Sequence, residues 1–330
     1  MPDLTGVLLV VVFLALLFDF SNGWHDSANA IATVVSTRAV SPIVAVTGAG
    51  ILNILGAYMS TAVAKTVGAG LVEPSAVTQA VVASALAGAI IWNLITLLLG
   101  LPTSSSHALI GGLVGAAVTH GGWLVVKFSG LRKVLEAMVL SPFLGFGIGL
   151  TLMVIISWVF FRASRGWATA LFRRMQIVSA SFMAFSHGAN DAQKAMGIIT
   201  LALLSSGTIA HAEVPGWVIG SCALAMGLGT AAGGWRIVRT LGMRIVKLEP
   251  VHGFAAETGA AAVLLATAHF GLPVSTTHTI TTTVMGVGAV KRLSAVRWGV
   301  TAKIVFAWLC TLPGAAVLAS LIYLVIARFM

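Results

Sequence analysis

Long stretches without a single Asp, Glu, Lys or Arg constrain this chain more than any other feature of its sequence. One of them runs from Pro74 to Val126. Charged residues make up only 8% of the chain and apolar residues 58%, whereas an average soluble domain is about 25% charged. A soluble chain with this composition could not cover its surface with polar groups. We therefore predict an all-α integral membrane protein with several crossings of about 20 apolar residues each.

The charge-free stretches indicate where the chain is expected to cross the membrane. Two of them are interrupted by Gly-Leu-Pro, at residues 100–102 and 271–273. We expect about 10–12 transmembrane or re-entrant helices, with broken helices at the centre of the fold. The stretches are Leu4–Phe18, Ala39–Ala64, Pro74–Val126, Ala137–Phe161, Ala195–Ala212, Val214–Trp235, Thr258–Val290 and Ile304–Ala327.

The distribution of basic residues predicts the orientation in the membrane. The chain has a formal net charge of +10, and cytoplasmic loops of membrane proteins are enriched in Lys and Arg. The region 162–174 contains several arginines and no acid, which predicts a cytoplasmic connector, whereas the connections around Glu73 and Glu213 are predicted to be external. One group disagrees with a simple five-span count, because it falls on the external side: Lys127, Arg132 and Lys133.

Two other interpretations of the basic, apolar sequence are not supported. No basic run alternates with exposed aromatic residues, so we expect no nucleic-acid partner. The first residues, Met1-Pro-Asp, lack the basic segment that begins a cleavable signal peptide, so none is expected.

Two motifs occur twice, in the same order and at almost the same offset. Residues 20–30 (FSNGWHDSANA) match residues 185–195 (FSHGANDAQKA), which aligns Asp26 with Asp191. Residues 100–107 (GLPTSSSH) match residues 271–278 (GLPVSTTH). A repeat with an odd number of spans inserts its second copy upside down, which is the inverted-repeat plan of many secondary transporters. The predicted units are a first repeat over 1–161, a basic connector over 162–174 and a second repeat over 175–330.

The Gly-Leu-Pro motifs predict two half-helices whose N-termini face a buried site. A backbone break is tolerated in a bilayer only where it lines a cavity or is buried in protein, and Pro followed by Ser or Thr is typical of a helix start. Each half-helix offers free N–H groups and hydroxyls at its positive end, which favour an anion. The alternative is that the hydroxyls bond only to their own helix. The predicted anion-binding residues are Ser104, Ser105, Ser106, Ser275, Thr276 and Thr277.

Asp26 and Asp191 hold equivalent places in the two copies of the other motif. Ionisable groups in a membrane are costly and usually functional. Together with the side-chain carbonyl oxygens of Asn29 and Asn190, the two carboxylates offer the oxygen ligands that suit a hard cation. They are expected to bind Na⁺, to exchange a proton, or to contact a metal ion bound to the substrate. The alternative is a structural polar cluster that joins broken helices.

Several further polar residues are candidates. Glu257 begins a charge-free stretch and is a candidate coupling-ion ligand, with Asn53 in the comparable place of the first half. Lys194 follows the second acidic motif and is expected either to contact the anion or to pair with Asp191. The other candidates are Asp19 and His25, expected at the mouth of the pathway, and His107, His187 and His278, each interpretable as a structural hydrogen-bonding group or a proton-transfer group.

At these residues the sequence resembles the inorganic phosphate transporter family, the PiT type. Its duplicated Gly-Ala-Asn-Asp motif is intact at residues 188–191, whereas the copy at 23–26 has Trp-His in place of Ala-Asn. The paired hydroxyl motifs also match, and the resemblance to the compact bacterial form covers essentially the whole chain. It implies symport of inorganic phosphate with Na⁺ or H⁺, in some bacterial members as a metal–phosphate complex. It also implies a homodimer with binding between the repeats.

We therefore expect a secondary phosphate importer of the bacterial cytoplasmic membrane, with lipid and a second copy as partners and no resident cofactor. One alternative is a sulfate permease of the same family. An intramembrane enzyme using the Asp pair is another, but the chain lacks His-Glu-x-x-His and Gly-x-Ser-x-Gly. A passive channel is a further alternative, but paired broken helices around acidic residues are more typical of a carrier with alternating access. The predicted coupling-ion ligands are Asp26, Asn29, Asn190, Asp191 and Glu257, and the candidate metal contacts are Asp26 and Asp191.

Overall fold

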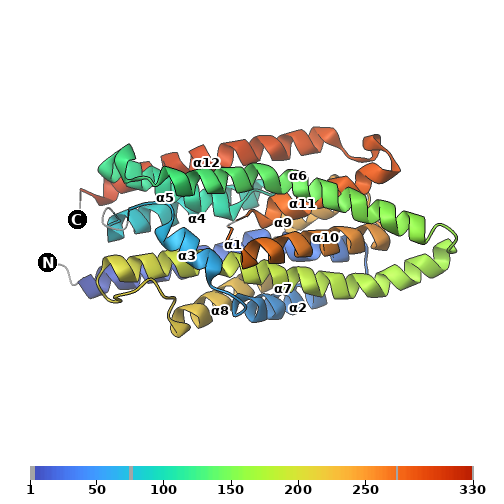
Figure 1. Ribbon diagram of the computed structural model, residues 1–330, viewed down its shortest axis with the longest axis horizontal. Helices are drawn as coiled ribbons and strands as arrows, with labels where there is room; N and C mark the ends of the chain where they lie inside the picture. Colours follow the sequence, from blue (N-terminus) through green and yellow to red (C-terminus); the bar gives the residue numbers. More distant parts are fainter. Residues whose placement is uncertain (1–3, 74–76, 273, 329–330) are drawn as a thin grey trace.

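The computed structural model describes residues 4–73, 77–272 and 274–328, and these residues form an elongated bundle of α-helices (Figure 1). The predicted all-α class is confirmed. Pro273, which belongs to the second Gly-Leu-Pro motif, lies outside the described residues. The first half forms α1 (Leu4–Ser36), α2 (Pro42–Ala57), α3 (Ala62–Ala69), α4 (Gln79–Leu99), α5 (Ser105–Gly121) and α6 (Phe128–Val159). The second half forms α7 (Arg165–Ser205), α8 (Gly216–Ala232), α9 (Trp235–Arg239), α10 (Pro250–His269), α11 (Thr276–Lys291) and α12 (Trp298–Ile326).

Helix length and hydropathy identify the membrane spans. Among the described residues, α1, α4, α6, α10 and α12 are each long and apolar enough to cross a membrane. A sixth candidate is the pair of α8 and the segment Trp235–Arg244, which begins with α9 and is bent by 58° against α8. The half-helices α5 and α11 have 17 and 16 residues, which corresponds to about 25 Å at 1.5 Å per residue. The hydrocarbon core is about 30 Å thick. The fold is therefore that of a multi-pass membrane protein, and the total number of crossings stays a prediction.

Both acidic motifs lie inside unbroken helices, which corrects the expected span boundaries. The charge-free stretches predict boundaries at Phe18 and Ala195, but α1 and α7 run without interruption through Asp26 and Asp191. A helix satisfies its own backbone hydrogen bonds, so polar side chains can be accommodated wherever neighbouring helices bury them. The stretch 39–64 is divided between α2 and α3, and the basic segment 162–174 is helical from Arg165 onward.

The two Gly-Leu-Pro motifs break their helices in the same way. Gly100 and Gly271 have φ angles of 67° and 66°, a left-handed conformation that glycine adopts without steric cost. The N–H groups of Leu101 and Leu272 each donate to a carbonyl five residues earlier, at 2.9 Å in both cases. This Schellman-type ending satisfies the last carbonyls of α4 and α10. The chain then starts α5 and α11 at equivalent positions, as the sequence predicts.

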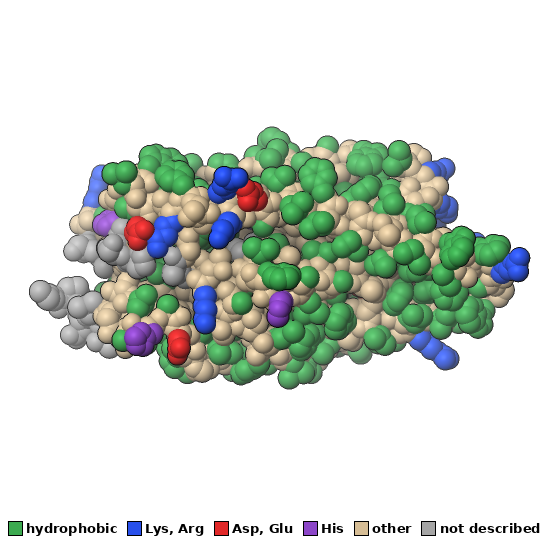
Figure 2. Space-filling model, viewed as in Figure 1, with side chains coloured by type: hydrophobic (Ala, Val, Ile, Leu, Met, Phe, Trp, Pro, Cys, Tyr) green, Lys and Arg blue, Asp and Glu red, His purple; other side chains and the backbone are tan. Residues whose placement is uncertain are grey.

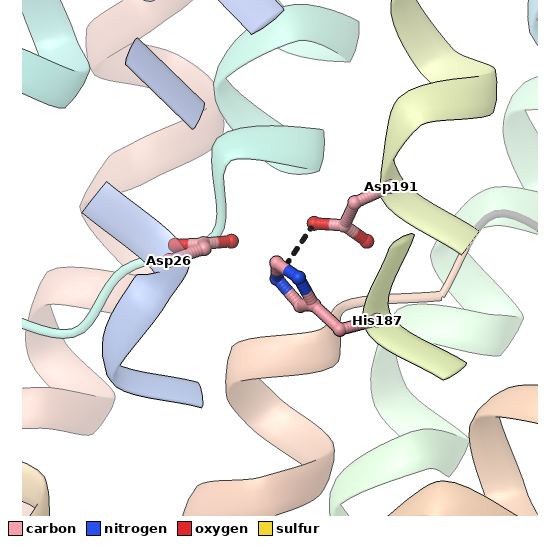
Figure 3. Close-up of side chains that lie close together, drawn as sticks. All are labelled: Asp26, His187 and Asp191. Carbon is pink, nitrogen blue, oxygen red and sulfur yellow. Dashed lines mark ion pairs between the residues drawn. The ribbon is translucent and has the colours of Figure 1, made fainter. Parts of the chain in front are cut away.

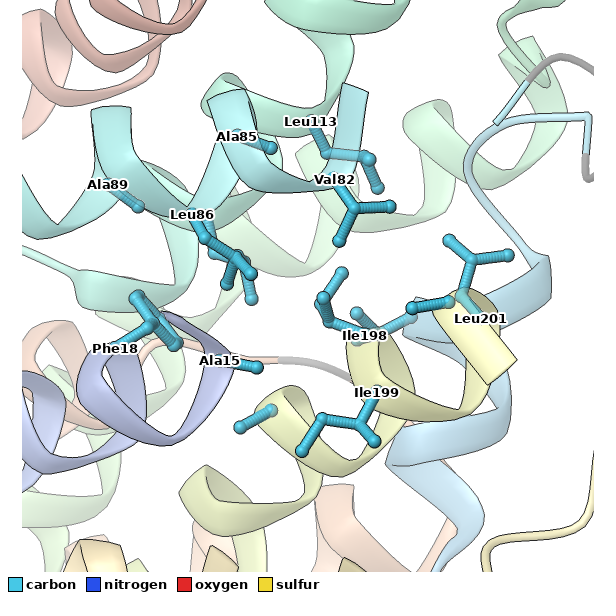
Figure 4. Packing of buried hydrophobic residues seen from close by; sticks show 14 of the residues in the cluster. Ala15, Phe18, Val82, Ala85, Leu86, Ala89, Leu113, Ile198, Ile199 and Leu201 are labelled. Carbon is cyan, nitrogen blue, oxygen red and sulfur yellow. The ribbon is translucent and has the colours of Figure 1, made fainter. Parts of the chain in front are cut away.

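Two apolar clusters pack on either side of a polar layer. One cluster contains residues 11–18 of α1 and residues 192–203 of α7, with side chains of α4 and α5 against them (Figure 4). The other contains residues 28–34 of α1 and 183–184 of α7, with α10 and α11. The acidic motifs therefore lie between two hydrophobic regions, in the middle of the bundle. Both clusters combine helices from the two halves of the chain.

The chain termini and the central connection lie at opposite ends of the bundle (Figure 1). On the face in Figure 2, basic side chains at the right-hand end stand without acidic ones, whereas acidic and basic side chains are mixed toward the left. The cytoplasmic position of the connection between α6 and α7 stays a prediction. Lys127, which disagrees with a simple span count, lies 3.5 Å from Glu73, and Arg132 pairs with Glu136 at 2.7 Å.

The order of elements is the same in both halves of the chain. Helices α1 to α6 correspond in sequence order to α7 to α12. The contacts are exchanged between the halves, because α1 packs on α8 and α2 on α7, while α5 packs on α12 and α6 on α11. Such an exchange is what a two-fold axis in the membrane plane would produce. Superposition of the halves stays a prediction.

The glycines of the acidic motifs allow the close approach of these helix pairs. A Cβ atom on Gly23 would collide with the carbonyl oxygen of Met226 in α8, and one on Gly188 with the carbonyl oxygen of Asn53 in α2. The backbones of α1 and α8, and of α7 and α2, are thus in direct contact. Small residues commonly allow such packing in membrane helices.

We predict that Gly23→Ala and Gly188→Ala each lower the free energy of unfolding by about 1–3 kcal/mol, the usual cost of overpacking. Thermal unfolding in detergent would measure this loss. Gly48→Ala in α2 is the matched control, since nothing lies within 4 Å of its added Cβ. An equal fall in melting temperature for all three variants would contradict the assignment.

Candidate functional site

The N-termini of the half-helices α5 and α11 meet inside the polar layer. The rings of His107 and His278, each in the first turn of its helix, lie 4.7 Å apart between centroids. Trp308 of α12 stacks on His278 at 3.9 Å. Its indole N–H donates to the carbonyl oxygen of Pro102 at 2.8 Å, so one side chain ties the start of α5 to that of α11. The sequence prediction of two facing half-helices is therefore consistent with these contacts.

The predicted anion-binding hydroxyls fall into two groups. Ser104 and Ser275 are N-cap residues whose hydroxyls accept the N–H of His107 and His278, at 3.3 and 3.1 Å. The others occupy the first two helical positions, where backbone N–H groups have no intrahelical acceptor. These are Ser105, Ser106, Thr276 and Thr277, all buried. The hydroxyls of Ser104 and Ser275 thus cap the two helices. The backbone N–H groups of the first two residues in each helix are left to bind an anion.

Asn29 of α1 connects the acidic motif to the start of α11. Its side-chain amide donates to the hydroxyls of Thr276 and Thr277, at 3.2 and 2.9 Å. The Thr276 hydroxyl donates to Asp191 Oδ2 at 3.2 Å. Asn29 Oδ1 has no hydrogen-bond partner among the described residues. Both duplicated motifs therefore contribute to one site, although they are far apart in the sequence.

Asp26 and Asp191 come together around His187, as Figure 3 shows. One ligand atom from each of these three buried residues lies within 4.8 Å of the other two. His187 Nε2 is 3.6 Å from Asp191 Oδ2, and its Nδ1 is 2.8 Å from Asn53 Oδ1. Two carboxylates and an imidazole at this spacing provide a set of donors that suits a cation.

The neighbours of the two aspartates differ. Lys194 Nζ donates to Asp191 Oδ1 at 2.5 Å. This lysine therefore pairs with Asp191, which is one of the two contacts expected for it. On the other side, His25 Nδ1 lies 2.6 Å from Asp26 Oδ1. Both polar atoms of the Asn190 side chain lack a hydrogen-bond partner among the described residues. The structure therefore brings the predicted residues of both acidic motifs into one buried layer.

Glu257 belongs to a separate polar cluster. Its carboxylate accepts hydrogen bonds from Thr33 at 2.5 Å, Ser179 at 2.5 Å and Gln176 at 3.1 Å. Thr33 lies seven residues beyond Asp26 on α1, so the cluster is about 10 Å farther along that helix. Asn53, expected to be its counterpart, instead contacts His187. The three donors to Glu257 belong to neither duplicated motif, so the motifs do not predict them.

Asp19 and His25 are buried, which corrects their expected place at the mouth of a pathway. His25 lies inside because its Nε2 is 3.0 Å from the Thr96 hydroxyl of α4 while its Nδ1 contacts Asp26. Neither carboxylate oxygen of Asp19 has a hydrogen-bond partner among the described residues. The polar layer is therefore wider than the motif alignment suggests.

The helical spacing of polar residues in the sequence indicates some of the additional site residues, including the donors to Glu257. Residues at spacings of three or four lie on one face of a helix. Asp26, Asn29 and Thr33 follow this spacing on α1, and Gln176 and Ser179 follow it on α7. That pattern predicts a continuous polar face along each helix, although it does not say which polar residues meet across helices.

Comparison with known proteins gives a consistent answer. Residues 22–319 match the model of the phosphate transporter family. A Rhizobium meliloti protein named "Probable low-affinity inorganic phosphate transporter" is 49% identical over 98% of this chain and 96% of its own length. A Bacillus subtilis protein of the same name is 43% identical over 96% of both chains. A solved structure titled "The sodium-dependent phosphate transporter" superposes with a TM-score of 0.91 at 26% identity, covering 98% of this chain and all of the other.

The two cap residues and their neighbour Ser105 should respond differently to loss of the hydroxyl. We predict that Ser104→Ala and Ser275→Ala each lower stability by about 0.5–2 kcal/mol, because an N-cap hydrogen bond is lost. Ser105→Ala should leave stability unchanged, since its hydroxyl has no hydrogen-bond partner among the described residues. Thermal melting in detergent separates the two groups. A loss at Ser105 as large as at Ser104 would show that the capping assignment is wrong.

Proposed function

We propose, from the premise that this chain belongs to the phosphate transporter family, that it is a secondary active symporter that imports inorganic phosphate together with a cation. Phosphate transport itself, by a multi-pass cell membrane protein that is not an enzyme, follows from the family and the helices. The proposal concerns the mechanism, the coupling ion and the residues. One observation carries it: the N-termini of α5 and α11 meet beside Asp26 and Asp191.

Phosphate is proposed to bind between the two half-helix N-termini. Free backbone N–H groups and the positive end of each helix dipole favour an oxyanion, and the hydroxyls of Ser105, Ser106 and Thr277 add further donors. Thr276 contributes its backbone N–H, because its hydroxyl donates to Asp191. These residues are buried, and hydrogen bonds are stronger where the local dielectric is low. The site thus recognises a tetrahedral anion largely through neutral groups, with Ser104 and Ser275 fixing the helix ends.

The coupling cation is proposed to bind on the side of the two aspartates. Asp26 and Asp191 supply carboxylate oxygens, while Asn29 and Asn190 supply side-chain carbonyl oxygens without partners among the described residues. Carboxylates repel phosphate, so their position next to an anion site favours binding only when a cation or a proton neutralises them. Cation binding then strengthens phosphate binding, and the coupling must be reciprocal.

Na⁺ and H⁺ both remain candidates for the coupling ion. The match to a structure titled as sodium-dependent supports Na⁺, and the oxygen-rich ligand set suits it. Glu257 is proposed as a further coupling-ion ligand. It is a buried carboxylate, and its three hydroxyl and amide partners are carried by α1 and α7, the helices that also carry Asp26 and Asp191. The group of Asp26, His187 and Asp191 also supports cargo in the form of a metal–phosphate complex.

Alternating access is proposed to arise from movement of the two halves around this layer. The helices that carry the site come from both halves, and the hydrophobic clusters on either side would close it in turn. We further expect a homodimer in a lipid bilayer. The runner-up substrate is sulfate, another tetrahedral oxyanion, and competition by sulfate against phosphate uptake distinguishes the two.

Removal of hydroxyls at the half-helix N-termini should weaken phosphate binding. We expect Ser106→Ala and Thr277→Val each to lower phosphate affinity about tenfold or more, because a buried hydrogen bond to a charged group contributes about 1.5–3 kcal/mol. Equilibrium binding of labelled phosphate in detergent measures this effect. Thr169→Val, which removes an exposed hydroxyl in α7, is the control. Unchanged affinity in both site variants would leave the half-helix site without support.

Replacement of an aspartate should affect coupling more than binding. We expect Asp26→Asn and Asp191→Asn to impair gradient-driven accumulation of phosphate more severely than they lower equilibrium phosphate binding. The effect should be larger at Asp26, whose motif has Trp24 and His25 in place of Ala and Asn. The measurement is phosphate uptake into proteoliposomes with Na⁺ and pH gradients imposed independently.

The control for the aspartate variants is Glu136→Gln, which changes an exposed carboxylate on α6. If both aspartate variants still concentrate phosphate as well as the parent protein, the coupling role is wrong and Glu257 becomes the next candidate. If the parent protein itself accumulates no phosphate under either gradient, the symport proposal fails.

A further inference from the structure

We propose that Lys194 is a built-in cation for Asp191, so that only the Asp26 side of the site takes up a transported cation. The inference rests on the proposed symport of phosphate. In the aligned motifs, Lys194 stands three residues after Asp191, where the first copy has Asn29 three residues after Asp26. The two copies therefore place an ammonium group and a neutral amide at equivalent positions.

The geometry of the pair shows a close, fully buried contact. Lys194 Nζ donates to Asp191 Oδ1 at 2.5 Å, and the side chains of Lys194 and Asp191 are 1% and 0% exposed. A buried charge whose partner is removed becomes strongly destabilising. Among the described residues, the side-chain hydrogen bond of Lys194 is to Asp191. Lys194 therefore neutralises the second acid of the duplicated motif.

The first copy of the motif has no lysine at the equivalent position. Asn29 carries no charge, and its amide is used to bond Thr276 and Thr277. Its Oδ1 atom has no partner among the described residues, and Asp26 has the His25 ring against its Oδ1. A carboxylate beside an available carbonyl oxygen is what an incoming hard cation requires. The two equivalent acids are thus compensated differently, one by the chain and one by a transported ion.

Lys194 also affects the charge near the proposed phosphate site at the start of α11. Asp191 Oδ2 accepts the hydroxyl of Thr276, the first residue of that helix. The positive charge of Lys194 is therefore linked through Asp191 to a residue of the proposed phosphate site, where it offsets the repulsion between carboxylate and anion. Because a lysine cannot leave the protein, the cycle carries one cation fewer than two acidic sites would allow. Lys194 is a positioning residue in this account.

The test replaces Lys194 by the residue found in the other copy. Phosphate binding by the full-length protein in detergent is measured in choline chloride and in NaCl at equal ionic strength and pH. In choline, K194N should bind phosphate at least about tenfold more weakly than the parent, since Asp191 is left unneutralised. Saturating Na⁺ should restore much of the affinity, by a larger factor than in the parent. K194R should keep the parent's response to Na⁺, and Lys133→Asn, at an exposed lysine of α6, controls for loss of charge.

Two results would overturn the inference. One is parent-like affinity of K194N in choline. The other is an equal loss in choline and in Na⁺, which would mark Lys194 as a purely structural residue or a direct phosphate ligand. If K194N does not fold, the double variant D191N/K194N decides. Recovery of the fold by removing both charges supports neutralisation, and failure to recover it contradicts neutralisation.

The same experiment keeps this inference separate from the proposed function. Absence of phosphate binding and of gradient-driven uptake in the parent protein would refute the symport proposal whatever the Lys194 variants do. A parent that binds and accumulates phosphate, combined with a K194N variant that gains no response to Na⁺, would refute only the role of Lys194.

Discussion

The cost of placing charge in the middle of a bilayer governs this structure. Carboxylates and ammonium groups are tolerated there only when they are paired, hydrogen-bonded or bound to an ion. The buried layer between the two hydrophobic clusters contains Asp26 and Asp191 together with Lys194, the only buried lysine among the described residues. Two carboxyl groups therefore share one ammonium group in this layer. A site with that balance gains stability from an incoming cation, which is the physical basis for coupling cation binding to transport.

Anion binding next to these acids depends on how the backbone is broken. Gly100 and Gly271 end α4 and α10 in the same left-handed conformation, which lets α5 and α11 begin inside the protein. Asn29 then joins α1 to the start of α11, and Thr276 joins α11 to Asp191. Movement of one half relative to the other would thus alter the anion and cation sites together. These shared hydrogen bonds, more than any single residue, link the two ions in the proposed cycle.

The sequence predicts those parts of the fold that depend on local chemistry. The helix breaks, the capping residues and the pairing of motifs follow from glycine, proline and hydroxyl patterns. The continuity of α7 is not visible, because Asp191 and Lys194 interrupt its apolar run and only tertiary burial makes them tolerable. The burial of Asp19 and His25 and the partners of Glu257 depend on contacts between α1, α4, α7 and α10. Such contacts are set by helix packing. A single sequence shows the periodicity of each helix face, but it does not show which faces meet.

An experimental structure of the full-length protein with phosphate and Na⁺ bound would test the proposed mechanism most sharply. That mechanism requires tetrahedral density between the first turns of α5 and α11, in contact with Ser106 and Thr277, and a cation on the Asp26 side of the same buried layer. Phosphate bound elsewhere, with the first turns of α5 and α11 contacting only protein or water, would contradict it.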